Sequence, residues 1–208
     1  MTDVPAQPYR TPHITPVKAQ TFGMWLFLLG LAILFFSGMF IYAFIRLRGA
    51  NLPEVGEYRG LMSNWKLFAS TFLVLAASVT IHVALQAVRR EKQRKFMTWL
   101  IVTDVLAVLF LVVQTPAMIE LLGRDAGAQS AATATIREGR LWTILFIYVL
   151  IHALHVLGGM IYLAVVTIKG ARGGYDHEHH VGVRHAALYW HFLDIVWIFM
   201  FATFIALG

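Results

Sequence analysis

The chain has 208 residues, of which 59% are hydrophobic and 13% are charged, with a net charge of +6 and no cysteine. Soluble domains carry about 25% charged residues, so this composition excludes a soluble enzyme and indicates an integral membrane protein of one domain. The lack of cysteine excludes disulfides, iron–sulfur ligation and thiol chemistry, and the positive charge is better explained by basic cytoplasmic loops than by nucleic-acid binding.

The N-terminal segment 1–20 is polar, and its prolines at positions 5, 8, 12 and 16 indicate an extended tail. The remainder, 21–208, contains five apolar runs that are long enough to cross a bilayer, which takes about 20 residues in a helix. The predicted fold is therefore all-α, an integral membrane bundle of five transmembrane helices. We expect these helices at 21–45, 67–88, 96–119, 141–168 and 186–207.

Basic residues set the expected orientation of the five helices. The short connection between the second and third runs contains Arg89, Arg90, Lys92, Arg94 and Lys95. Short loops rich in Lys and Arg stay in the cytoplasm, so we expect the N-terminus in the cytoplasm and the C-terminus outside. The segment 123–139, which is rich in small residues, is then expected to form a flexible outer connection.

Small residues mark two of the predicted helices. Gly23, Gly30 and Ser37 recur every seven residues on the first, and Gly158 and Gly159 are adjacent on the fourth. Small side chains let helix backbones approach closely in a membrane. We expect these positions to pack against other helices, and the alternative is a lipid or a partner subunit lying in the groove that they form.

Polar groups inside the predicted spans fall at two depths. At 1.5 Å per residue, one group lies roughly 6–10 Å from the cytoplasmic helix ends, whereas a deeper pair on the fourth span lies at roughly 20–25 Å. Such groups are costly in hydrocarbon and mark a function or a specific pairing. The predicted inner polar layer is His82, Asp104, His191 and Asp194, and the deeper pair is His152 and His155.

Four intramembrane histidines raise the hypothesis of a bound haem, which needs two ligands at matching depth on facing helices. His152 and His155 are one turn apart on one helix and cannot straddle a haem, so His82 and His191 are the only matched pair. The carboxyls of the layer can bond those two instead, and no thiolate or methionine cluster accompanies them for copper or zinc. We therefore expect hydrogen-bonded structural histidines, and no metal or haem held by this chain.

Two further expectations concern charge. Asp104 must be paired or protonated, as must Asp194, because an unpaired ionised carboxylate is costly to bury. The loop 176–180 reads Asp-His-Glu-His-His, and its histidines titrate near neutrality. That loop is either a solvated connection, a proton-collecting surface or an adventitious divalent-metal site. The candidate proton antenna is His177, His179 and His180.

Several of these residues carry a resemblance to a known family. The motif YWHFLDIVW at 189–197 resembles the last helix of subunit III of the haem–copper terminal oxidases. The segment HALHVLGG at 152–159 is similar to the preceding helix of that family, with Ala153 in place of the usual glycine. The weaker segments GMWLFL at 23–28 and TIH at 80–82, together with Gln114, also fit. The resemblance covers nearly the whole chain, in the short five-helix form.

The resemblance implies a fold with a two-helix and a three-helix group around a lipid-binding cleft. Family members commonly carry a carboxylate near the position of Gly30 and Leu31, and often a Glu where Ala117 stands. Roles of those carboxylates therefore do not transfer to this chain. The residues expected to shape the cleft and the helix contacts are Gly23, Gly30, Ser37, His152, His155, Gly158 and Gly159.

The implied function is that of a non-catalytic subunit in an aerobic respiratory complex that reduces O2 to water and translocates protons. Haem and copper would reside in subunit I, the main partner, with subunit II, other subunits and phospholipid as further contacts in a bacterial inner membrane. The inner polar layer would fix helix packing and, with the loop histidines, supply protons. Three alternatives remain open: an accessory protein of nitric oxide reductase, a small proton-coupled transporter and a stand-alone di-haem cytochrome.

Overall fold

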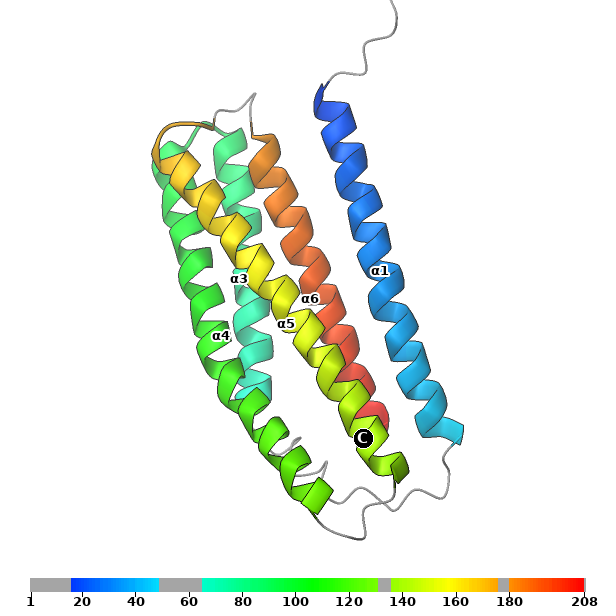
Figure 1. Ribbon diagram of the computed structural model, residues 1–208. Coiled ribbons are helices and arrows are strands. Elements are labelled where there is room, and N and C mark those ends of the chain that lie inside the picture. The colour runs from blue at the N-terminus through cyan, green and yellow to red at the C-terminus, as the bar shows by residue number, and fades with distance from the viewer. Residues whose placement is uncertain (1–15, 49–64, 131–135, 176–179, 208) are drawn as a thin grey trace, which may run out of the picture.

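A computed structural model describes residues 16–48, 65–130, 136–175 and 180–207, and this part of the chain is built from five helices without a strand. Each helix is long and apolar enough to cross a membrane, which confirms the predicted all-α bundle. The helices are α1 (Pro16–Arg48), α3 (Trp65–Arg89), α4 (Gln93–Ser130), α5 (Ile136–Ala171) and α6 (Val181–Leu207) (Figure 1).

The helices extend further than the apolar runs predicted. α1 begins at Pro16, so the last five positions of the predicted tail 1–20 are helical. Proline suits the first turn of a helix, because its fixed φ is already helical and its missing N–H is not needed there. α4 continues through Pro116 to Ser130 and α5 begins at Ile136. Most of the predicted loop 123–139 is therefore helical, since its alanines favour helix once the flanking spans have nucleated it.

A tight turn joins α3 to α4 at the end of the bundle where α1 begins (Figure 1). Glu91 adopts a left-handed conformation with φ 57°. The N–H of Lys92 donates to the carbonyl of Ala87 at 3.0 Å, and the N–H of Glu91 donates to the carbonyl of Val88 at 3.2 Å. This pair of bonds is a Schellman motif, which satisfies carbonyls that the end of a helix leaves open. α5 ends and α6 begins at the same end of the bundle.

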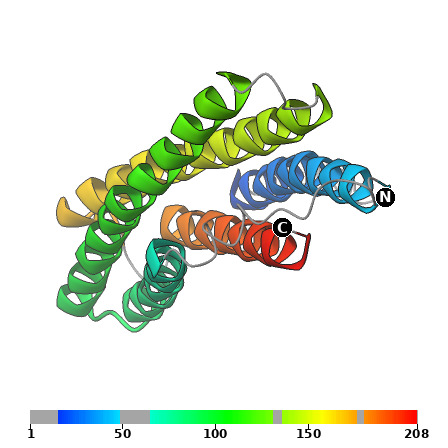
Figure 2. The ribbon, with the colours of Figure 1, turned by 90° about the horizontal axis from the view of Figure 1, so that it is seen from below.

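α6 occupies the centre of the bundle. It contacts α1, α3 and α5, while α4 packs against α3 and α5 on the far side (Figures 1 and 2). α1 contacts α6 and α5, whereas its sequence neighbour α3 packs mainly against α4. The first two helices therefore do not form a pair opposed to the last three, and the expected two-plus-three grouping around a cleft is not how these helices pack.

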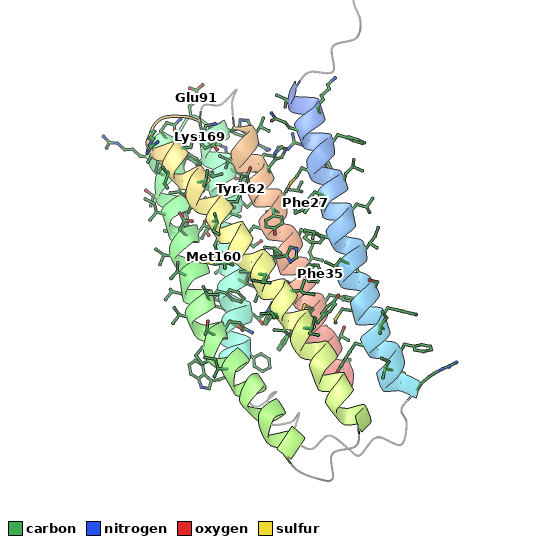
Figure 3. All side chains as sticks on the ribbon, in the orientation of Figure 1. Phe27, Phe35, Glu91, Met160, Tyr162 and Lys169 are labelled. Atoms are coloured by element: carbon green, nitrogen blue, oxygen red, sulfur yellow. The ribbon has the colours of Figure 1, made fainter. Side chains whose placement is uncertain are left out.

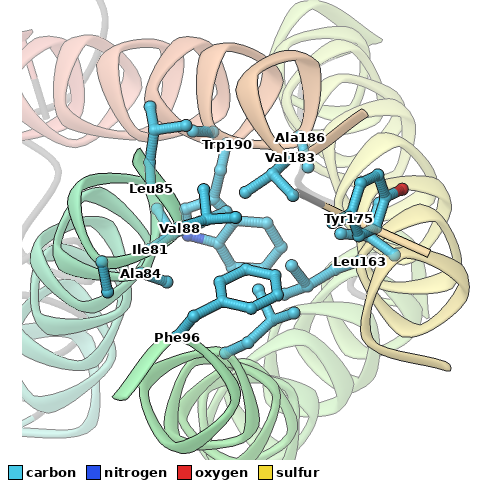
Figure 4. Packing of buried hydrophobic residues seen from close by; sticks show 14 of the residues in the cluster. Ile81, Ala84, Leu85, Val88, Phe96, Leu163, Tyr175, Val183, Ala186 and Trp190 are labelled. Carbon is cyan, nitrogen blue, oxygen red and sulfur yellow. The ribbon is translucent and has the colours of Figure 1, made fainter. Parts of the chain in front are cut away.

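Two clusters of buried hydrophobic residues fill the interior. The first lies among α3, α4, α5 and α6, with Trp190, Phe96 and Tyr175 packed around Ile81 and Leu163 (Figure 4). The second brings α1 into the bundle, and Phe27 and Phe35 point from α1 toward α5 and α6 (Figure 3). Because lipid tails are as apolar as these side chains, close packing rather than exclusion of water holds such clusters together.

Candidate functional site

Two members of the predicted inner polar layer meet between α3 and α6. The rings of His82 and His191 have centroids 6.0 Å apart. Gln86 Nε2 donates to His82 Nε2 at 3.0 Å, and His191 Nδ1 shares a hydrogen bond of 2.6 Å with the hydroxyl of Ser78. We call Ser78, His82, Gln86 and His191 the α3–α6 polar patch. The contributions of Ser78 and Gln86 follow from the helical spacing of four residues on either side of His82, a signal that sequence reasoning passed over.

Asp104 lies elsewhere. Its Oδ2 accepts a hydrogen bond of 2.6 Å from the hydroxyl of Thr167, which links α4 to α5. The neighbouring Thr103 donates to Thr80 at 2.9 Å and so links α4 to α3. The members of the predicted layer therefore do not form one connected group, since depth along a helix does not say toward which neighbour a side chain points.

Asp194 is buried, with 3% of its surface exposed. Neither carboxyl oxygen has a hydrogen-bond partner in the described part of the chain. Of the two states expected for this acid, paired or protonated, pairing is absent from these residues, although His191 is one helical turn away.

The deeper histidines of α5 pack against aromatic rings. His152, 3% exposed, stacks on Trp197 with centroids 5.8 Å apart and meets the edge of Phe35 at 5.7 Å. Its Nδ1 has no hydrogen-bond partner among the residues described, so the expected hydrogen-bonded role is not what holds it. His155 bonds the carbonyl of Ile151 through Nδ1 at 2.7 Å and packs on Phe35 at 5.3 Å. His152 therefore joins α5 to both α1 and α6, and His155 joins α5 to α1.

The glycines divide into packed and open positions. A Cβ added at Gly159 would lie 3.0 Å from Tyr189 Cε1 and 3.2 Å from Leu193 Cδ1, so the missing side chain of this glycine lets α6 approach closely. A Cβ at Gly23, Gly30 or Gly158 would meet nothing within 4 Å. Those three therefore do not pack against another helix within the described chain.

The third position of the α1 stripe is also open. Ser37 is exposed, and its hydroxyl donates to the carbonyl of Leu34 at 3.1 Å. The close approach of α1 to α5 occurs one residue later, at Gly38, where a Cβ would collide with the ring of Tyr148. Sequence reasoning missed Gly38 because the seven-residue repeat drew attention to the adjacent face of the same helix.

Only one histidine of the loop 176–180 lies among the described residues. His177 and His179 lie outside the described residues, and His180 is half-buried, with no hydrogen-bond partner for Nδ1 in the part of the chain that is described. The preceding Tyr175 is buried, and burial, with a smaller contribution from Tyr162, raises the pKa of its hydroxyl. Its carbonyl accepts a bond of 3.0 Å from Gln93. This segment therefore closes the end of the bundle.

No group of three or more His, Asp or Glu that could hold a metal ion occurs among the described residues. The side chains singled out above serve mainly as contacts between helices. The motif 189–197 supplies several of these contacts. Tyr189 donates to the carbonyl of His155 at 3.0 Å, and Trp197 Nε1 donates to Thr71 at 3.1 Å.

Comparison with known proteins identifies the family. The family profile described as Cytochrome c oxidase subunit III matches residues 3–208. Cytochrome c oxidase subunit 3 of Loxodonta africana is 30% identical over 199 residues, which is 92% of this chain and 71% of the relative. The corresponding protein of Prototheca wickerhamii is 28% identical over 200 residues, 93% and 71% of the two chains. A probable quinol oxidase subunit 3 of Staphylococcus aureus is 31% identical over 164 residues, 76% and 77% of the two chains. The chain therefore belongs to the cytochrome c oxidase subunit III family and is a multi-pass membrane component of an oxidase complex.

Proposed function

We propose that this chain is a non-catalytic subunit of a respiratory haem–copper oxidase in the bacterial inner membrane, with the N-terminus in the cytoplasm. It braces subunit I, contacts subunit II and other subunits, binds phospholipid and supports proton uptake for the reduction of O2 to water. Subunit I holds the haem and copper. The family membership supports this assignment, and the charge of the turn at 90–95 supports the orientation.

The proposal rests mainly on the contacts that the motif 189–197 makes within the subunit. Four of its polar and aromatic side chains are buried, namely Tyr189, Trp190, Asp194 and Trp197, and His191 is half-buried. Because α6 contacts three other helices, this motif sets the shape that the subunit presents to its neighbours. A motif that makes its contacts inside the subunit holds the helices in place, as the bracing of a neighbouring subunit requires.

Mild purification from the native membrane tests the assignment directly. We expect haem signals in a reduced-minus-oxidised spectrum to travel with a large co-purifying subunit. The type of haem then narrows the class of oxidase. A colourless protein without partners would overturn the proposal and favour a transporter, and haem bound to this chain alone would favour a cytochrome.

Replacement of Asp194 by Ala tests whether this residue supports assembly of the complex or its catalytic turnover. The truncation leaves a cavity where α6 meets its neighbours, so we expect a several-fold lower yield of assembled complex with near-normal turnover per haem in the complex that remains. The matched control is Ile195→Ala, at the adjacent exposed position. Normal assembly with abolished turnover would contradict a structural role.

Orientation has its own test, because the chain lacks cysteine and any cysteine introduced is unique. Lys92→Cys places a thiol on the exposed turn between α3 and α4. An impermeant maleimide should label it in inverted vesicles and leave it unlabelled in intact cells. The reverse pattern would place the N-terminus outside.

A further inference from the structure

The α3–α6 polar patch lies on the outside of the bundle at membrane depth. His82 and Gln86 are exposed, and Ser78 and His191 are half-buried. His82 is seven residues before Arg89, the last residue of α3, and therefore lies about 10 Å from that helix end. An imidazole and a carboxamide thus face the surroundings of this chain within a membrane-crossing segment.

The patch continues an exposed row along α3. Phe72, Leu75, Val79, His82 and Gln86 follow one another at spacings of three and four residues, and all five are exposed. Residues at this spacing form one stripe on a helix, which is the pattern through which helices pack against each other. The row is apolar at one end and polar at the other.

Other exposed hydroxyl groups in the spans donate hydrogen bonds to carbonyls of their own helix. Ser37 donates to the carbonyl of Leu34 at 3.1 Å, and Thr115 donates to that of Leu111 at 2.7 Å. Each therefore needs nothing beyond its own helix and can face lipid.

His82 is different. Gln86 Nε2 can only donate, so His82 Nε2 accepts and its Nδ1 carries the proton. That N–H has no hydrogen-bond acceptor in the described part of the chain. Ser78 likewise engages one ring nitrogen of His191, and the other ring nitrogen has no hydrogen-bond partner among the described residues.

Lipid tails offer no hydrogen-bond acceptor, and ionisable residues in membrane spans face protein or a water-filled cavity. We propose that the exposed row of α3 with the α3–α6 polar patch is the docking surface for a transmembrane helix of another oxidase subunit. That helix places a carboxylate, amide or hydroxyl against His82. The inference rests on the proposed function, because it requires a partner complex, but it adds which face is covered and by what chemistry.

The competing face on α1 lacks these features. Its open positions Gly23 and Gly30 lie among exposed aromatic and aliphatic side chains, and its hydroxyl at Ser37 is already bonded. Such a face needs only lipid. The structure therefore provides an internal control for the proposed docking surface, on another membrane-crossing helix.

Site-directed photo-crosslinking tests the proposal. Val79 in the α3 row and Ile33 on α1 are both 64% exposed and both β-branched. A benzophenone maleimide attached to Val79→Cys in the assembled complex should cross-link to a partner subunit, whereas the same probe at Ile33→Cys should yield lipid adducts. Lipid adducts alone from Val79, in a complex that still contains its partner, would overturn the docking surface and leave the proposed function standing. Failure of any partner to co-purify with the unlabelled chain would overturn both.

A second variant tests the chemistry. His82→Leu should reduce co-purified partner about tenfold, which is the effect of losing about 1.4 kcal/mol of binding, while helix content and thermal stability of the chain in detergent stay unchanged. His82→Gln, which keeps an N–H donor, should restore most of the partner. Full recovery of partner with His82→Leu would show that the histidine does not bind a neighbouring helix.

Discussion

α1 and α6 both cross the membrane, but they relate to the bundle in opposite ways. α6 is the least hydrophobic of the five spans and the most buried, with 50% of its central residues inside the protein. α1 is more hydrophobic and only 28% buried. In water the more hydrophobic helix would be the buried one. In a membrane the surroundings are apolar, so hydrophobic side chains can face lipid and the polar and aromatic ones must find protein partners.

α1 nevertheless has one face directed inward. That face is a single stripe of buried residues, namely Leu28, Leu31, Phe35, Met39 and Tyr42. The stripe meets α5 and α6 through a few aromatic contacts. Substitutions on and off this stripe therefore measure how much of the attachment of α1 comes from specific packing.

The largest effect is expected at Phe35. It is 1% exposed and touches the rings of Tyr148, His152 and His155. Phe35→Ala should lower the free energy of unfolding by about 3 kcal/mol through lost packing. Phe40→Ala, on the same helix but 71% exposed, should change it by less than about 0.5 kcal/mol. Thermal unfolding in detergent measures both, and equal effects would mean that α1 is not held by its inner stripe.

A smaller effect is expected at Gly38. An alanine there collides with the ring of Tyr148, so Gly38→Ala should cost about 1–3 kcal/mol by overpacking. Gly30→Ala is the control, because its Cβ meets nothing within 4 Å. Denaturation in a detergent series compares the two variants. A cost at Gly30 equal to that at Gly38 would indicate that the outer stripe also packs against something.

Gly158 and Gly159, which are adjacent on α5, allow a comparison that tests the contact between α5 and α6. Gly159→Ala brings a methyl group to 3.0 Å from Tyr189 Cε1, and we expect a loss of about 1 kcal/mol as the two helices separate slightly. Gly158→Ala points into open space and should be neutral or slightly stabilising, because alanine favours helix. The thermal midpoints of the two variants would rank the positions, and the reverse order would contradict the packing of α5 on α6.

The smallest effect concerns the turn at Glu91. Its left-handed conformation is costly for a residue with a Cβ and free for glycine. Glu91→Gly should therefore stabilise the protein by about 0.5–1 kcal/mol, partly offset by any interaction of the carboxylate. Glu91→Ala, which keeps the Cβ, separates the two contributions. A glycine variant less stable than the alanine variant would refute the conformational argument.

The sequence by itself determined the number and the approximate limits of the spans, because hydrophobic length is set by the thickness of the bilayer. It also placed the packing motif on α6, since buried polar and aromatic groups stand out against an apolar run. The hydrophobic pattern did not predict the helix ends at Pro16, Ser130 and Ile136, because helical segments outside the hydrocarbon layer no longer need hydrophobic residues.

Only the tertiary structure decided which way each helix is turned about its axis. Asp104 meets Thr167 rather than His82, the stripe of Gly23, Gly30 and Ser37 faces outward, and Gly38 takes the close contact. In a soluble protein, the hydrophobic face of each helix would have indicated which side of it points inward. Here lipid and protein interior are equally apolar, so the direction of a side chain follows from the fit between helices, which no single helix encodes.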